Sequence, residues 1–321
     1  LTIGDTPVFD NWTQSDALDD QPYNSSGAFT MEAGKLYPFE LEMFEEDGSD
    51  LMRLEWGYDG QAMSPIPTDN FYTIEDGVAV GISVDGNAGN DIISGYHGDD
   101  YLDGGDGNDI LKGNMGSDTI LGDAGDDQIF GGGNDDTLIG GAGVDTIYGD
   151  AGNDDVTAGD GADLVYGGEG NDQISGGGDN DTIYAGVGDD TVYGGDGNDI
   201  IMGSAGDDTI VGGNDDDVAV FAGNQSNYTF ASSPDGLTIN VTDTANNYSD
   251  TVSGVETLRF DDGDIYVSQD ANGLVLTGTT SGDTITVVGT VPVTLKGDDG
   301  NDTISGGEGD DTILGDAGND I

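Results

Sequence analysis

Aspartate recurs at every ninth position over a long stretch of this sequence. Residues 86–220 divide without a gap into 15 units of nine residues, and the sixth residue of every unit is Asp. Short carboxylates suit hard divalent cations such as Ca²⁺, which takes about six to eight oxygen ligands. An aspartate file held in one register therefore predicts repeated cation binding.

The candidate ligands are the aspartates at position six of these units, with three more in a later, shorter block. They are Asp91, Asp100, Asp109, Asp118, Asp127, Asp136, Asp145, Asp154, Asp163, Asp172, Asp181, Asp190, Asp199, Asp208, Asp217, Asp302, Asp311 and Asp320.

The overall charge supports a need for cations. The 321 residues include 66 acidic and 5 basic side chains, a formal net charge of −61. Such self-repulsion opposes a compact fold unless cations sit among the carboxylates. The few basic residues form no basic patch, which excludes nucleic acid and an anionic membrane surface as partners. An acidic disordered tail is the alternative, but here the charge is periodic and alternates with aliphatic residues.

The sequence offers no catalytic constellation, so we expect no enzyme in this chain. His97 is the only histidine, which excludes a His-Glu-x-x-His zinc motif, and no Gly-x-Ser-x-Gly elbow occurs. Cysteine is absent, which excludes disulfides and thiolate metal sites. No apolar run is long enough to span a membrane, and no N-terminal targeting segment is visible. Leu1 and Ile321 both lie within patterned sequence, so we expect a part of a longer protein.

The other positions of the unit predict the elements that hold the aspartates. Position eight is aliphatic in all 15 units, and position four is Gly in 12; the exceptions are Asn134, Asp179 and Asp215. Asn and Asp are the residues after Gly that best tolerate positive φ, which predicts a left-handed turn. We expect a six-residue turn followed by a three-residue strand whose middle side chain points inward. Two units then complete one coil of a parallel β-roll.

This pattern resembles the repeats-in-toxin family, whose consensus is Gly-Gly-x-Gly-x-Asp followed by x, an aliphatic residue and x. The resemblance covers residues 86–220. It implies an all-β parallel β-roll, or β-solenoid, with Ca²⁺ between stacked turns. Asp91 with Asp109, and Asp100 with Asp118, would be such pairs, and carbonyls of the glycine region would complete about 13 sites. It also implies an extracellular protein, commonly exported by type I secretion from a Gram-negative bacterium.

The core of such a roll is thin. One aliphatic side chain per nine residues cannot by itself offset the entropy lost in ordering those residues. Metal binding should therefore be coupled to folding, with the block disordered at low Ca²⁺ and folded at high Ca²⁺.

Three further segments flank or interrupt the repeats. Residues 1–80, through Asp10-Asn11-Trp12 and Leu54-Glu55-Trp56, resemble the second half of an anthrax-protective-antigen-type β-sandwich. Some members of that family bind glycans through Ca²⁺ held by paired aspartates, but Asp19-Asp20 is not assigned that role. Residues 221–276 predict a β-rich hairpin cap over the open edges of the roll. Residues 277–321 form a second, truncated block, which the Val287–Leu295 insert interrupts.

Position nine of alternate units is apolar along one face. The residues are Phe130, Tyr148, Tyr166, Tyr184, Met202 and Val220. One interpretation is cross-strand stacking that stiffens the sheet. The other is a contact surface for self-association or for a glycan.

These features favour a calcium-binding structural and adhesive module of a large secreted or cell-surface protein. Calcium is the expected cofactor, and a glycan or another cell-surface ligand is the expected partner. Two alternatives remain: the C-terminal carrier portion of a secreted hydrolase or toxin, and a self-assembling surface-layer or filament subunit.

Overall fold

The computed structural model describes residues 81–270 and 273–321 in full, and the backbone of five strands before residue 81. Trp12, Trp56 and the Asp19-Asp20 pair lie outside the described residues. Strands β1 (Thr2–Ile3) and β2 (Thr6–Pro7) pair with each other. Strands β3 (Tyr23–Met31), β4 (Lys35–Glu46) and β5 (Ser49–Glu55) form an antiparallel ribbon.

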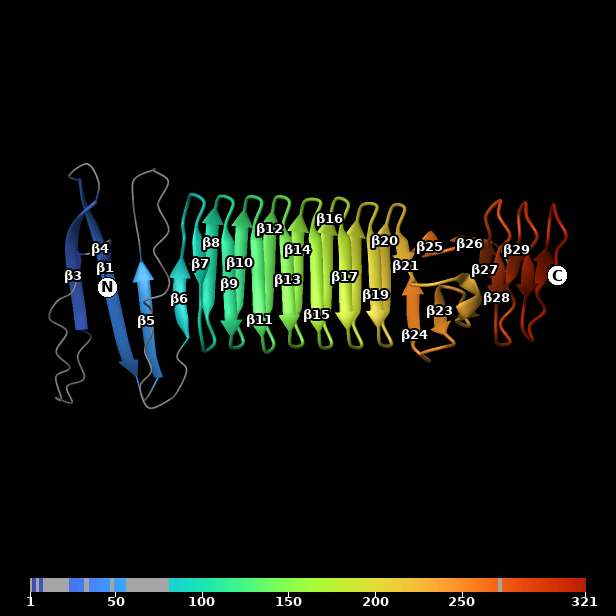
Figure 1. Ribbon diagram of the computed structural model, residues 1–321, viewed down its shortest axis with the longest axis horizontal. Helices are drawn as coiled ribbons and strands as arrows, with labels where there is room; N and C mark the ends of the chain where they lie inside the picture. The colour runs from blue at the N-terminus through green and yellow to red at the C-terminus, as the bar shows by residue number, and fades with distance from the viewer. Residues whose placement is uncertain are drawn as a thin grey trace.

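Two long sheets dominate the rest of the molecule (Figure 1). The repeat strands of the first sheet are β6 (Ile82–Asp85), β8 (Tyr101–Asp106), β10 (Thr119–Ala124), β12 (Thr137–Ala142), β14 (Asp155–Asp160), β16 (Gln173–Gly178), β18 (Thr191–Asp196) and β20 (Thr209–Asn214). Those of the second are β7 (Ile92–Ser94), β9 (Ile110–Met115), β11 (Gln128–Gly133), β13 (Thr146–Ala151), β15 (Leu164–Glu169), β17 (Thr182–Val187), β19 (Ile200–Ala205) and β21 (Val218–Val220). Strands that follow one another in the chain thus alternate between the sheets.

Neighbouring repeat strands within each sheet are parallel and 18 residues apart. Ile120, for example, lies opposite Leu102 on one side and Leu138 on the other. One coil therefore contains two nonapeptides, and the predicted parallel β-roll is confirmed. The ribbon of β3–β5 joins its first sheet, because β5 pairs parallel with β6.

The strands are longer than the repeat pattern predicted. Most span six residues, positions seven to nine of one unit and one to three of the next, as in β10. Within them both position eight and position one face inward, so Ile120 and Gly122 are buried while Leu121 is half-exposed. The expected strand length of three residues was wrong, because positions one to three of the next unit continue the strand. Of positions seven to nine, the middle side chain points inward, as predicted.

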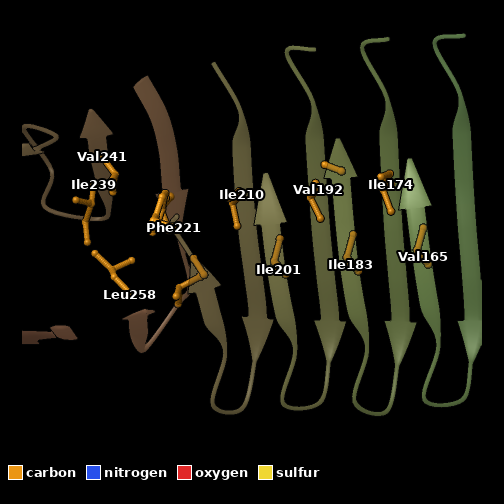
Figure 2. Packing of buried hydrophobic residues seen from close by; sticks show 14 of the residues in the cluster. Val165, Ile174, Ile183, Val192, Ile201, Ile210, Phe221, Ile239, Val241 and Leu258 are labelled. Atoms are coloured by element: carbon orange, nitrogen blue, oxygen red, sulfur yellow. The ribbon is translucent and has the colours of Figure 1, made fainter. Parts of the chain in front are cut away.

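The core lies between the two sheets. All 15 position-eight residues are buried, from Ile93 to Ala219. Figure 2 shows Val165, Ile174, Ile183, Val192, Ile201 and Ile210 pointing into this narrow space from alternate sheets. The larger apolar side chains of the roll thus form one buried file per sheet, as the sequence predicted, and Ala158 and Ala185 add small buried methyl groups from position one.

The turns adopt the predicted left-handed backbone. Position four has positive φ in all 15 units, including the three exceptions Asn134 (81°), Asp179 (71°) and Asp215 (77°). These residues therefore replace glycine without changing the turn.

Residues 221–276 extend both sheets. Strand β24 (Ser249–Ser253) pairs parallel with β20, and β25 (Thr257–Phe260) pairs parallel with β21. A short 3₁₀ turn (Gln225–Asn227) and the strands β22 (Tyr228–Ser232) and β23 (Thr238–Asp243) come before them. Strands β26 (Gly263–Asp270) and β27 (Gly273–Thr277) follow. The segment thus covers the open edges of the roll by adding strands to them.

The second block continues beyond this segment (Figure 1). Its strands are β28 (Thr284–Thr286), β29 (Thr294–Lys296), β30 (Thr303–Ser305) and β31 (Thr312–Leu314). Strand β29 pairs parallel with β27, so the second sheet runs on into this block. The insert supplies β29 and places Val293 where the repeats carry aspartate, and the backbone N–H of Val293 donates to Asp311 Oδ1 at 3.1 Å.

Candidate metal centre

The position-six aspartates form a ladder along each edge of the roll. The backbone N–H of each aspartate donates to Oδ1 of the aspartate 18 residues later. Thirteen such bonds, each 2.7–2.9 Å long, join Asp91 to Asp217 along the two edges. The structure thus brings together the expected neighbours Asp91 with Asp109 and Asp100 with Asp118.

The second carboxylate oxygen has no partner in almost every rung. Oδ2 is buried without a hydrogen bond in 14 of the 15 roll aspartates and in Asp302. A buried carboxylate oxygen without a partner is costly and calls for an explanation such as an unseen ion. The orphaned oxygens repeat with the coil, so whatever satisfies them repeats as well.

Asp100 is the one roll aspartate whose Oδ2 is hydrogen-bonded. It accepts a hydrogen bond of 3.1 Å from the backbone N–H of Tyr96, at position two of its own unit. Position two has positive φ in the other 14 units, as at Asn87 (68°) and Gly105 (92°), but not at Tyr96. A left-handed position two therefore accompanies every orphaned Oδ2 in the roll. Sequence reasoning had assigned positive φ only to position four.

The first glycine of each unit leaves a small space beside the orphaned oxygen. A Cβ built on Gly122 would lie 2.5 Å from Asp127 Oδ2 and 2.5 Å from the carbonyl oxygen of Gly140 in the next coil. Calcium–oxygen distances are about 2.3–2.6 Å. The space that glycine keeps open therefore has the right distance from two hard oxygens. Ala158 and Ala185 take the place of this glycine in two units, with their methyl groups buried.

Burial also makes the charged form of these aspartates unfavourable. It raises the pKa of six of them to about 7. The N–H donated from the preceding coil lowers the pKa in part, and the negative charges of nearby aspartates raise it further. The six are Asp127, Asp136, Asp154, Asp181, Asp190 and Asp217. The protein alone does not compensate these carboxylates.

Basic side chains do not neutralise the ladder. Among the described residues, the one ion pair joins Arg259 Nε to Asp264 Oδ1 at 3.4 Å, outside the ladder. Lys112 lies over the ring of Phe130, 5.3 Å from its centroid. Nor do three or more His, Asp or Glu side chains converge on one metal position in the part of the chain that is described. A cation in this ladder must draw most of its ligands from backbone carbonyls, which Ca²⁺ accepts.

The residues present fit calcium on three observations: orphaned carboxylate oxygens, a glycine-lined space at calcium distance from two oxygens, and a donor set made only of oxygen. Bound Ca²⁺ would supply positive charge between the coils. The aspartates and glycine carbonyls would hold it in place.

The second block carries a shorter ladder. Asp302 is buried, and its Oδ1 accepts from the N–H of Asp283 at 2.9 Å. Asp302 in turn donates its own N–H to Asp320 Oδ1 at 3.2 Å, and Asp320 is exposed. Asp311 is half-buried. Of the three predicted ligands here, Asp302 thus has the environment most like that of the roll aspartates.

Two acidic residues missed by sequence reasoning extend the ladder. The N–H of Asp208 donates to Asp250 Oδ1 at 3.0 Å, and the N–H of Asp217 donates to Glu256 Oε2 at 2.9 Å. Asp250 is followed by Thr-Val and Glu256 by Thr-Leu. In the repeats, position six is likewise followed by a variable residue and then an aliphatic one. That local pattern could have revealed them.

A second ladder at position five was also missed. The side-chain oxygen of a position-five residue accepts a hydrogen bond from the backbone N–H of the position-five residue one coil later. Asn90 accepts from Asn108 at 3.1 Å in this way, and Asp189 accepts from Asp207 at 2.9 Å. This direction is opposite to that of the aspartate ladder. The exposed acids and amides at this position therefore tie neighbouring coils together.

The aromatic file at position nine is stacked. Phe130, Tyr148, Tyr166 and Tyr184 lie face to face, with centroids 4.9–5.0 Å apart and planes within 7° of parallel. The predicted cross-strand stacking is confirmed. Since neighbouring rings cover each other's faces, mainly ring edges remain for other contacts.

The comparisons with known proteins agree with this geometry. The family model for the RTX calcium-binding nonapeptide repeat matches segments that together span residues 83–220 and 294–321, just over half of the chain. The chain belongs to the RTX calcium-binding repeat family. RTX repeats bind Ca²⁺, so calcium is the cofactor, as the sequence predicted. They form a structural module that is typical of secreted proteins of Gram-negative bacteria and of type I secretion substrates.

A second family model, the PA14 domain, matches residues 1–70, which confirms the resemblance noted for the N-terminal segment. No curated protein matches the RTX chain. Among solved structures, the extracellular lipase LipA from Serratia marcescens is similar at 24% identity and a TM-score of 0.24. The match covers 50% of this chain and 28% of the lipase. Among the described residues, we find no helix long and apolar enough to span a membrane.

Proposed function

We propose that this chain is a structural and adhesive module of a large secreted or cell-surface protein. In this function calcium folds and stiffens a stalk, and the stalk presents the PA14 domain at its N-terminal end. The domain limits in this proposal are 1–80, 86–220, 221–276 and 277–321. The single observation that carries the proposal is the orphaned Oδ2 of the roll aspartates, repeated coil after coil.

The proposed ligands are the position-six aspartates and the carbonyls of the glycine region. Without cations, unpartnered carboxylates would face one another along both edges, and burial would oppose their charge. With cations, each edge becomes a chain of ionic contacts between coils. The roll would then resist bending, and folding would wait until the chain meets millimolar calcium outside the cell.

The continuity of the sheets supports a stalk. The second sheet continues from the roll through residues 257–277 into the second block, and the first sheet runs from β3 through the roll to β24 and its hairpin. A ligand bound at one end would therefore be connected to the other end through hydrogen-bonded strands. A glycan on the PA14 segment is our proposed ligand class.

Self-association through the position-nine residues Phe130, Tyr148, Tyr166, Tyr184 and Met202 remains a prediction. The half-exposed ring edges support it, and the stacked ring faces argue against a flat sugar platform on this file. We therefore propose the PA14 segment, and not this file, for the glycan site.

Small-angle X-ray scattering and a glycan array test this proposal on the whole chain. In millimolar Ca²⁺ we expect a rigid, elongated particle and binding to specific glycans; in excess chelator we expect an expanded chain and no binding. A chain that becomes rigid with Ca²⁺ but binds no glycan or cell surface would contradict the adhesive role. That result would favour the alternative that this chain is the carrier portion of a secreted hydrolase or toxin. A catalytic domain upstream in the full-length protein would support this alternative.

A further inference from the structure

Residues 221–248 form an excursion, in which the chain leaves the roll after β21 and returns to it at β24. After the return, the turn between β24 and β25 stacks on the last turn of the repeats, which joins β20 to β21. Strand β24 ends at Ser253, which lies opposite Val211, and β25 begins at Thr257, which lies opposite Val218. Only Gly254, Val255 and Glu256 connect them. By register Gly254 takes position one and Glu256 takes position six, so three residues replace the six of a repeat turn.

This short turn supplies the groups that a repeat turn supplies. Asp217 is 0% exposed, and its Oδ2 is buried without a partner. Its N–H donates to Glu256 Oε2 at 2.9 Å, as it would to the next aspartate. A Cβ on Gly212 would lie 2.6 Å from Asp217 Oδ2 and would collide with the carbonyl oxygen of Gly254. The same combination of orphaned carboxylate, facing carbonyl and acidic rung is therefore present.

The neighbouring junction on the other edge differs in its nearest atoms, although Asp208 Oδ2 is also buried without a hydrogen bond. Asp250 provides the acidic rung for Asp208. However, the three atoms nearest to a Cβ on Gly203 all belong to Asp208, and no carbonyl of the next coil is among them. At Gly212 the Gly254 carbonyl oxygen is thus the nearest atom, whereas at Gly203 any carbonyl of the next coil lies farther away than these Asp208 atoms.

We propose that Asp217, Gly254 and Glu256 form an additional Ca²⁺ site outside the recognised repeats, and that this ion fastens residues 249–260 to the roll. Asp250 serves as a hydrogen-bonded rung and binds no ion of its own. The site joins residues on either side of the excursion, so an ion there holds both ends of the excursion in place. Calcium then orders the connection to the second block as well as the repeats. This inference rests on calcium binding by the RTX repeats.

The test compares Glu256→Gln with the whole wild-type chain. The Gln side chain keeps an oxygen that can accept from the N–H of Asp217, so the contact persists while the charged ligand is lost. We expect native mass spectrometry at saturating Ca²⁺ to count one ion fewer. We expect hydrogen exchange in β24 and β25 to be at least tenfold faster, with the strands of the roll unchanged.

Two further variants complete the experiment. Asp216→Asn removes an exposed charge beside the site and should keep both the ion count and the protection of wild type. Asp250→Asn should keep the ion count. An unchanged ion count and unchanged exchange in Glu256→Gln would overturn the proposal, as would loss of ions throughout the roll. Absence of calcium uptake by wild type would instead contradict calcium binding by the repeats.

Discussion

Gln225 hydrogen-bonds to Asp283 across 58 residues of sequence. Its Nε2 donates to Asp283 Oδ1 at 3.0 Å, and its Oε1 accepts from the N–H of Thr284 at 2.8 Å. Within the roll the backbone of the preceding coil makes this pair of bonds, as Asp91 does with Asp109 and Ile110. The buried side-chain amide thus substitutes for a peptide unit at the first coil of the second block. Asp283 Oδ2 is satisfied by the N–H of Thr279 at 2.7 Å, so this turn needs no cation.

Replacing Gln225 with Ala should loosen the start of the second block. The change removes the acceptor of the Thr284 N–H and leaves Asp283 Oδ1 with the longer 3.4 Å hydrogen bond from Thr279 Oγ1. Losing such partners in the interior typically costs about 1–3 kcal/mol. We expect faster hydrogen exchange at residues 283–304 and a lower denaturation midpoint for that block. Gln173→Ala, which changes an exposed glutamine, is the matched control and should have little effect. Equal exchange in both variants would refute the role of Gln225.

Removing calcium should unfold the repeats. With no cation between the coils, the orphaned Oδ2 atoms are uncompensated and the thin core cannot hold the chain. We expect far-UV circular dichroism to lose its β signal in excess chelator and to regain it at millimolar Ca²⁺. A β signal that stays unchanged in chelator would contradict the coupling of metal binding to folding.

Acidification should partly replace calcium. Burial raises the pKa of Asp127 and Asp154 to about 7, whereas the ordinary value is 3.8. The folded roll therefore binds more protons than the unfolded chain between about pH 7 and pH 4, and its stability in chelator rises as pH falls through this window. We expect more β signal at pH 5 than at pH 8 without calcium. With calcium, the same protons should compete for the carboxylates and weaken binding. If the metal-free protein loses β signal as the pH falls from 8 to 5, the predicted direction of this pH dependence is wrong.

Replacing Tyr96 with Gly should create one more cation site. Glycine can take the positive φ found at position two of the other roll units, which would turn the N–H away from Asp100 Oδ2. We expect calorimetry or native mass spectrometry to detect one additional Ca²⁺ per chain. His97→Gly, at the adjacent exposed position, is the control and should leave the count unchanged. If Tyr96→Gly also leaves it unchanged, position two does not control the site.

Replacing Tyr148, Tyr166 and Tyr184 with Ser should weaken the roll without abolishing its calcium transition. Each stacked pair contributes about 0.5–1.5 kcal/mol beyond burial, and no ladder aspartate is touched. We expect a lower melting temperature at saturating Ca²⁺, while Tyr193→Ser on the opposite sheet should have a smaller effect. Sedimentation velocity on the same variants tests self-association. Association that persists in the triple variant would exclude this file as the contact.

The repeats determined their own fold, because every part of the prediction was local and recurred 15 times. An aliphatic residue two positions after each aspartate fixed which side chain faces inward. Gly, Asn or Asp at position four fixed the left-handed turn, and Asn134 adopts it as the glycines do. Only one register satisfies all units at once, so the 18-residue coil could be read from the sequence.

The tertiary structure decided what happens where the period fails. Asp250 and Glu256 reach the ladder across 42 and 39 residues, after an excursion whose length no local pattern specifies. Gln225 meets Asp283 only because folded strands bring the two segments together. The orphaned Oδ2 atoms likewise depend on the backbone at position two and on the next coil's carbonyl. Such contacts between distant segments depend on how coils stack, whereas sequence periodicity specifies only what each coil repeats.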